Sequence, residues 1–113
     1  MSAQPIHSSD LPGSGRARDF VGEDHGVGVT LILLDAEPGF GPRLHRHPYE
    51  EVFVIHEGEA TFTVGDAEIE AGAGDIVVAP ANTLHRFVNT GAGQLRFTSV
   101  HRSPRFETEW LEP

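Results

Sequence analysis

Two stretches decide the fold of this chain: GFGPRLHRHPYEEVFVIHEG at residues 39–58 and GDIVVAPANTLHRFVN at residues 74–89. Each joins a run of β-branched and aromatic residues to turns rich in glycine or proline, which is typical of short strands. In the first stretch, His45 and His47 are two residues apart, so both imidazoles project to the same face of a strand. The two stretches therefore predict β-structure with polar side chains gathered on one face.

Similar β-rich runs occur before, between and after these two stretches. They cover residues 27–35, 51–56, 60–64, 67–70, 76–79, 84–88 and 95–101, with glycine, proline and asparagine in the turns between them. A parallel sheet would need helical crossovers of about ten or more residues, and all but one of the spacers, residues 36–50, are shorter than that. The sequence therefore predicts an all-β domain, either a sandwich or a barrel.

The two ends of the chain differ from this middle part. Residues 1–18 are polar and contain prolines and glycines, which predicts a flexible N-terminal arm. A single barrel domain is expected over residues 19–113. Its C-terminal tail carries Phe106 and Trp110, whose spacing fits one helical turn on the barrel or an extended segment held by its aromatic residues.

Length and composition exclude several classes of protein. With 113 residues, one domain is the reasonable expectation. The formal net charge of −9 disfavours nucleic acid and membrane surfaces as partners. The chain has no cysteine, and its longest apolar stretch, at residues 29–34, is too short to span a bilayer. We therefore expect a soluble, cytoplasmic protein whose metal ligands would be imidazoles and carboxylates.

The polar residues of the two stretches predict a metal site. Glu51 has the inward parity of the next strand, so Glu50 is its outward neighbour, and His85 supplies a third imidazole from a separate strand. The predicted ligands are His45, His47, Glu51 and His85. Imidazole nitrogens suit one divalent transition metal per chain, namely Fe, Mn, Ni, Zn, Co or Cu. The charge of the site is then +1, which favours an anionic ligand. A closed structural zinc site is the alternative.

The same residues resemble the cupin family. The first stretch has the pattern G, five residues, HxH, three residues, E, six residues, G, and the second has G, five residues, P, four residues, H, three residues, N. Asn82 stands where the family has glycine, and asparagine tolerates the left-handed conformation that such a turn needs. The resemblance covers residues 39–89. It implies a small jelly-roll β-barrel, the same four metal ligands, and commonly a homodimer.

Other residues with inward parity are candidates for a substrate pocket. We expect a catalytic contribution from Arg43, whose guanidinium would anchor an anionic oxygen unless the side chain turns to solvent. His101 is a candidate for a supporting or proton-transferring group. The pocket is expected to be lined by Phe40, Phe53, Ile55, Phe62, Phe87, Phe97 and His101, although aromatic residues at strand spacing also form ordinary cores.

Function follows less directly, because cupins include enzymes and binding domains alike. The favoured interpretation is a metal-dependent enzyme acting on a small oxygenated organic molecule, with a dioxygenase preferred over an isomerase or lyase. The alternative is a small-ligand binding or sensing module without catalysis. The run at residues 29–34 is apolar on both faces, so we also expect a second subunit to cover its outer side as a homodimer.

Overall fold

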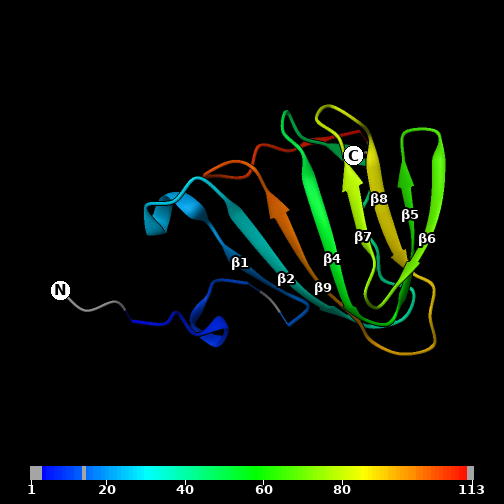
Figure 1. The fold of residues 1–113 in the computed structure, drawn as a ribbon, viewed down its shortest axis with the longest axis horizontal. Coiled ribbons are helices and arrows are strands. Elements are labelled where there is room, and N and C mark those ends of the chain that lie inside the picture. Colours follow the sequence, from blue (N-terminus) through cyan, green and yellow to red (C-terminus); the bar gives the residue numbers. More distant parts are fainter. Residues whose placement is uncertain (1–3, 14, 112–113) are drawn as a thin grey trace.

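The structure, a computed structural model, describes residues 4–13 and 15–111. Within these ranges, ten strands form two five-stranded antiparallel sheets (Figure 1). The first sheet has the order β1-β2-β9-β4-β7 and the second has the order β10-β3-β8-β5-β6. The predicted all-β class and jelly-roll barrel are confirmed.

The strands of the first sheet are β1 (Ala17–Phe20), β2 (Thr30–Ala36), β4 (Glu51–Glu57), β7 (Ile76–Ala79) and β9 (Leu95–His101). Those of the second sheet are β3 (His45–Arg46), β5 (Glu59–Val64), β6 (Ala67–Gly72), β8 (His85–Asn89) and β10 (Glu109–Trp110). Two short 3-10 turns, η1 (Ser8–Asp10) and η2 (Gly22–His25), flank β1. Among the residues described, no helix has the length and hydrophobicity needed to cross a bilayer.

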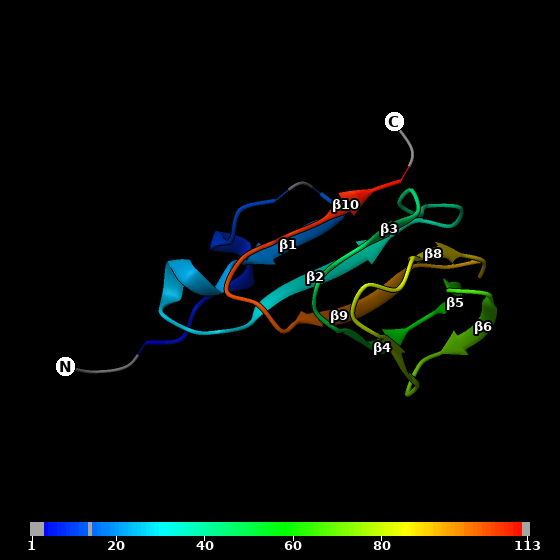
Figure 2. The ribbon, with the colours of Figure 1, turned by 90° about the horizontal axis from the view of Figure 1, so that it is seen from above.

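Both chain ends add strands that the β-rich runs did not predict. β1 begins at Ala17, inside the range expected for the arm, and pairs with β2. The division into arm and domain near residue 18 therefore stays a prediction. The tail is extended rather than helical, because β10 lies beside β3 and pairs with it (Figure 2). Of the two interpretations of the tail, the extended one is correct.

The core follows from alternation along the strands. In β4 every second residue is buried as far as Ile55, so Glu51, Phe53 and Ile55 all point into the barrel. Phe62 from β5 and Leu95 from β9 are also buried almost completely. Glu51 is the first residue of this row in β4, and it pairs with His101, the last residue of β9. The buried polar side chains therefore gather at this end of the interior. The apolar core fills the other end.

The turn between β7 and β8 has the left-handed residue that the sequence predicted. Asn82 has φ 61, and it is the non-glycine residue with positive φ among those described. Its backbone N–H donates to the carbonyl of His47 at 2.7 Å. An asparagine in this conformation costs less than most residues, so the turn keeps its shape without glycine. The turn thereby ties β8 to the segment that carries the histidine pair.

Candidate metal centre

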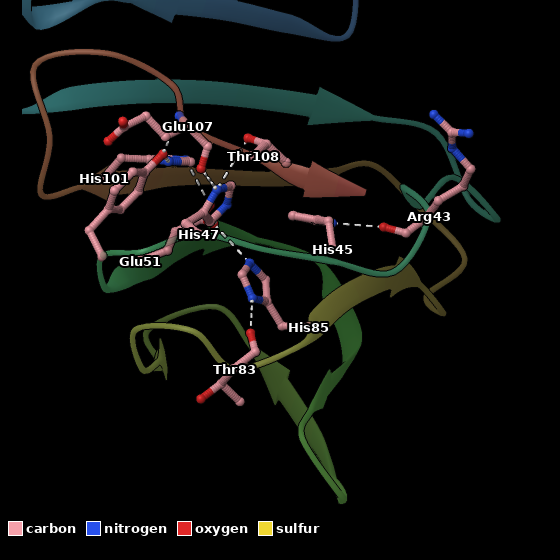
Figure 3. A network of polar contacts seen from close by, with 10 residues as sticks. Arg43, His45, His47, Glu51, Thr83, His85, His101, Glu107 and Thr108 are labelled. Atoms are coloured by element: carbon pink, nitrogen blue, oxygen red, sulfur yellow. Dashed lines mark hydrogen bonds and ion pairs between the residues drawn. The ribbon is translucent and has the colours of Figure 1, made fainter. Parts of the chain in front are cut away.

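Four buried side chains converge at the polar end of the barrel. His45 lies in β3 with His47 just after it, while Glu51 and His85 are the first residues of β4 and β8. His45 and His85 are direct partners across β3 and β8. One ligand atom from each of the four lies within 4.8 Å of the others (Figure 3). The structure therefore brings together the four residues predicted as ligands.

Each of the three imidazoles is anchored through its Nδ1 atom to a backbone carbonyl oxygen (Figure 3). The acceptors are Arg43 for His45 at 2.7 Å, Thr83 for His85 at 2.9 Å and Glu107 for His47 at 3.2 Å. A carbonyl oxygen can only accept, so Nδ1 donates and the Nε2 atom of a neutral ring keeps its lone pair. The backbone thus selects the tautomer that presents Nε2 as a ligand.

Glu51 is the carboxylate of this group, and its Oε1 atom meets two of the imidazoles. It lies 3.1 Å from Nε2 of His47 and 3.0 Å from Nε2 of His85. Burial acts to raise the pKa of Glu51, but its contacts with histidines outweigh burial and hold that pKa well below its usual range. Burial acts to lower the pKa of His85, and the contact with Glu51 raises it overall. Burial lowers the pKa of His45 to about 4.

The donor set fits a divalent transition metal ion. Donor atoms bound to one ion at about 2.1 Å lie roughly 3–4 Å apart, so the most widely separated of the four, which lie within 4.8 Å of one another, need to approach by about 1–2 Å. Without a proton or a cation between them, the Nε2 lone pairs would face the Glu51 oxygen as acceptor against acceptor. A bound cation removes that conflict. Imidazole and carboxylate donors leave the identity of the metal open.

A second buried layer supports Glu51 from its other side. Nε2 of His101 lies 3.1 Å from Oε2 of Glu51, without a well-aligned hydrogen bond. The Nδ1 atom of His101 is 2.9 Å from the hydroxyl oxygen of Tyr49. The same hydroxyl oxygen accepts a hydrogen bond from the backbone N–H of Glu107 at 3.3 Å. The Tyr49 hydroxyl can therefore donate to Nδ1, which places the ring proton of neutral His101 on Nε2, toward Glu51. The supporting or proton-transferring role expected for His101 stays a prediction.

A cavity of about 530 Å³ opens beside three of the four donors. Its wall includes His45, His47 and Glu51, together with apolar side chains from β2, β8 and β9 and from the tail. Five of the seven residues predicted for the pocket line it: Phe40, Phe53, Phe87, Phe97 and His101. The cavity is thus largely apolar, and it has the polar group at one end.

The other two predicted pocket residues, Ile55 and Phe62, lie in the core instead. Each is only 1% exposed, and neither is among the residues that line the cavity. Their inward parity was right, but parity gives the face of a strand and not the depth along the barrel. Both belong to the hydrophobic core cluster of the barrel. Their assignment to the pocket is therefore corrected.

The side chain of Arg43 does not join the four donors. It is exposed, and its guanidinium lies over the ring of Trp110, with 5.2 Å between the guanidinium carbon and the ring centroid. Figure 3 shows it pointing away from the histidines. Arg43 precedes β3, so the strand alternation used to place it does not apply there. Its contribution to the site in this geometry is the carbonyl oxygen that holds His45, not a charge on the cavity wall.

Three parts of the site were missed by the sequence reasoning. Tyr49 lies in the bend after β3, where no alternation rule assigns a direction. Asp19 belongs to the short strand β1, whose sequence ARDF has little strand character. The tail contributes Phe106, Thr108 and Trp110 to the cavity wall. The pair of aromatic residues in the tail was the available signal, since such residues seldom occur without something to pack against.

Comparisons with known proteins agree with this geometry. An acireductone dioxygenase from Heterostelium pallidum is 37% identical over 67 residues, which are 55% of this chain and 46% of that protein. The chain thus spans about half the length of that relative. An oxalate decarboxylase from Lactobacillus farciminis, solved with formate, superposes with a TM-score of 0.80 at 23% identity, over 94% of this chain and 35% of that one.

A third likeness covers both chains almost completely. An uncharacterized conserved protein with a double-stranded β-helix domain from Klebsiella pneumoniae superposes with a TM-score of 0.76 at 20% identity, over 99% of this chain and 100% of that one. Likenesses at such low identity show the fold alone. The sequence profile of the cupin domain matches residues 32–101, which include both histidine stretches and all four donors. The chain therefore belongs to the cupin family.

Proposed function

We propose that this chain is a metal-dependent enzyme that acts on a small oxygenated organic molecule. His45, His47, Glu51 and His85 are the proposed ligands. The observation that carries the proposal is that one ligand atom from each lies within 4.8 Å of the others at the end of a cavity of about 530 Å³. A closed structural site would not need such a cavity beside the donors. Chemistry on a bound small molecule is therefore favoured over a structural role.

A divalent metal ion held by these residues would supply a Lewis acid beside the cavity. The chain itself fixes the donors in advance, because Nδ1 of each imidazole is bonded to a backbone carbonyl. Phe53, Phe87 and Phe97 make the cavity wall apolar and exclude water from a bound molecule. We propose that His101, whose Nε2 atom lies 3.1 Å from Oε2 of Glu51 on the cavity wall, exchanges a proton with a substrate oxygen.

Among enzymes of this kind we favour a dioxygenase. The support is the relative named acireductone dioxygenase, whose identity of 37% extends over 55% of this chain. An isomerase or a lyase remains the second choice, since the same donors serve those reactions as Lewis-acid chemistry. A binding module that holds the molecule without converting it is the alternative to catalysis.

One experiment separates catalysis from binding. Metal-free protein is reconstituted anaerobically with Fe(II), Mn(II), Ni(II), Co(II), Cu(II) or Zn(II), and each form is exposed to air with a panel of enolisable diketones. Oxygen uptake with stoichiometric product supports a dioxygenase, and product without oxygen uptake supports an isomerase or lyase. Saturable binding with no turnover under any metal would contradict the enzyme and support the binding module.

We also propose that two copies associate through the outer face of the first sheet. The register aligns apolar side chains across it: Leu31, Val100, Val52 and Val78 form one row, and Leu33, Val54 and Ile76 contribute to the next. Ile76 and Val78 are 63% and 51% exposed. A twofold axis lets one such patch meet its own copy, so a homodimer covers it without a second kind of partner.

A further inference from the structure

One row of inward side chains crosses the first sheet from its edge to the metal centre. The register places them side by side on β1, β2, β9 and β4, in the order Asp19, Ile32, Ser99, Phe53. The adjacent row contains Thr30, His101 and Glu51. Asp19, Ile32, Ser99 and Phe53 all line the cavity that also reaches Glu51. The cavity therefore runs across the strands, with the metal group at one end and Asp19 at the other.

Asp19 gives the far end of this cavity a negative charge. It is half-buried, and burial raises the pKa of its carboxyl while the nearby His101 acts to lower it. No arginine is found among the described residues that line the cavity, and the chain contains no lysine. A carboxylate or phosphate at this end of a bound molecule would meet Asp19 with no arginine or lysine on the described cavity wall to offset the repulsion.

Ser99 is a second polar group with no explained role. Its side chain is fully buried, and its Oγ atom has no hydrogen-bond partner within the part of the chain that the structure describes. Buried hydroxyls in folded proteins almost always have a partner. Because Ser99 lies in the cavity wall, the missing partner is expected to come from a molecule in the cavity.

The spacing of the strands sets the length of that molecule. Neighbouring strands lie about 4.8 Å apart, so the Cα atoms of Asp19 and Ser99 are separated by about 10 Å across β2. Ser99 and His101 are two residues apart on β9, a distance of about 7 Å. One small molecule that contacts the metal group and Asp19 must therefore be elongated and must pass Ser99.

We propose that Asp19 and Ser99 determine specificity for an elongated small molecule that carries a metal-binding oxygen at one end and an ammonium or hydroxyl donor at the other. Asp19 accepts the hydrogen bond from the distal donor, and Ser99 bonds to a polar atom between the two ends. The apolar wall packs against the body of the molecule. This inference rests on the proposed function, because the metal group holds the first end.

Three catechols with the same ring and different distal groups test the proposal. Dopamine ends in an ammonium group, 3,4-dihydroxyphenylethanol in a hydroxyl and 3,4-dihydroxyphenylacetate in a carboxylate, and plain catechol lacks a distal group. Binding is measured by calorimetry without oxygen on Zn(II)-loaded protein, since zinc is not redox-active. We expect the ammonium and hydroxyl probes to bind at least about tenfold more tightly than the carboxylate probe. A hydrogen bond to the carboxylate of Asp19 is strong enough to give this difference. The ratio of the first two shows which donor is preferred.

Two variants and a matched control assign this preference to residues. Asp19→Asn should remove the discrimination between the ammonium and carboxylate probes and leave the affinity for catechol unchanged. Asp66→Asn removes the same charge in the exposed turn after β5 and should leave all affinities unchanged. Ser99→Ala should weaken the two donor probes severalfold without lowering the thermal stability of the ligand-free protein, because its hydroxyl has no partner to lose among the residues that the structure describes.

The outcomes separate this inference from the proposed function. If catechol binds equally to metal-loaded and metal-free protein, the metal centre and the inference both fail. If catechol needs the metal and the three extended probes bind equally, only the inference is overturned. Discrimination that persists in Asp19→Asn also overturns it. A loss of stability in ligand-free Ser99→Ala would show that the hydroxyl has a structural role and would overturn its assignment to the ligand.

Discussion

Nε2 of His101 lies 3.1 Å from Oε2 of Glu51, whereas His47 and His85 face the other oxygen, Oε1. The two oxygens of one buried carboxylate therefore have different partners. Oε1 is directed at the imidazoles that would share a metal, and Oε2 lies next to His101, which is outside that group. With this division, Oε1 of Glu51 is the oxygen that would hold a metal ion.

Removal of one proposed ligand should abolish metal binding. His47→Ala deletes a donor that is buried and contacts Glu51 directly. We expect metal content after purification and dialysis to fall to background, with a loss of affinity beyond about a hundredfold, because even changes behind the ligands cost about 10–100-fold. His56→Ala is the matched control, since His56 is exposed and bonds to Thr98 instead. Stoichiometric metal in His47→Ala would refute the ligand set.

The hydroxyl behind His101 should matter for both stability and metal binding. Tyr49→Phe removes the group that contacts Nδ1 of His101 at 2.9 Å and accepts the N–H of Glu107. We expect the free energy of unfolding to fall by about 1–3 kcal/mol, because buried polar atoms lose their partner. Metal affinity should fall about tenfold or more.

Denaturant unfolding and a metal titration measure the two effects in Tyr49→Phe. Thr90→Val serves as control, because it deletes one member of an exposed hydroxyl pair with Thr61. Tyr49→Phe with unchanged metal affinity would limit the hydroxyl to a structural role.

Metal uptake should release a proton in a pH-dependent way. In the metal-free site, contact with Glu51 raises the pKa of His85 above its ordinary value, so a proton must leave before Nε2 can bind metal. The number of protons that His85 releases per bound metal ion should therefore approach one below that pKa and fall to zero above it. The apparent affinity for the metal ion should fall about tenfold for each pH unit below the pKa of His85.

His45 should not contribute to this release near neutral pH, since burial lowers its pKa to about 4. Calorimetry in two buffers with different ionisation enthalpies counts the protons released at each pH. An affinity that stays constant on both sides of neutrality would contradict the prediction.

The proposed dimer can be broken without touching the interior. Ile76→Glu combined with Val78→Glu places charges on two exposed positions of β7. We expect sedimentation to show a dimer for the original chain and a folded monomer for the variant. Ile6→Glu, which changes an exposed isoleucine before η1, should remain dimeric. A mass for the original chain that is monomeric at every concentration would exclude the dimer.

The turn at Asn82 gives a test of backbone conformation alone. Asn82 has φ 61, so Asn82→Ala should cost about 1 kcal/mol of unfolding free energy, while Asn82→Gly should be nearly neutral. Thermal unfolding of the pair isolates the effect, because both variants lose the same side-chain amide. Equal stability of the two variants would show that the turn tolerates an ordinary residue.

The sequence predicted the parts of this molecule that depend on local pattern. Glu51 was placed inside and Glu50 outside because β4 alternates, and Glu50 is indeed paired with Arg102 at the surface. His45 and His47 have the same orientation for the same reason. The turns between the strands were also predicted from local sequence pattern, and β7 and β9 have the predicted bounds.

What the sequence did not predict depends on contacts between distant segments. Asp19 reaches the cavity only because β1 pairs with β2 at the edge of the sheet. Tyr49 meets His101 across 52 residues of chain. Arg43 was misplaced because strand alternation was extended past the end of β3. Local pattern states which way a side chain points within a strand, and tertiary pairing decides what it meets.

The tail has a consequence for how molecules enter and leave. The carbonyl of Glu107 orients His47, Phe106 and Trp110 form part of the cavity wall, and β10 is a strand of two residues beside β3. Displacement of β10 and residues 106–108 would open the cavity and would at the same time free the imidazole of His47, one of the proposed ligands. Entry of a small molecule and affinity for a metal ion would then depend on the same conformational equilibrium of the tail.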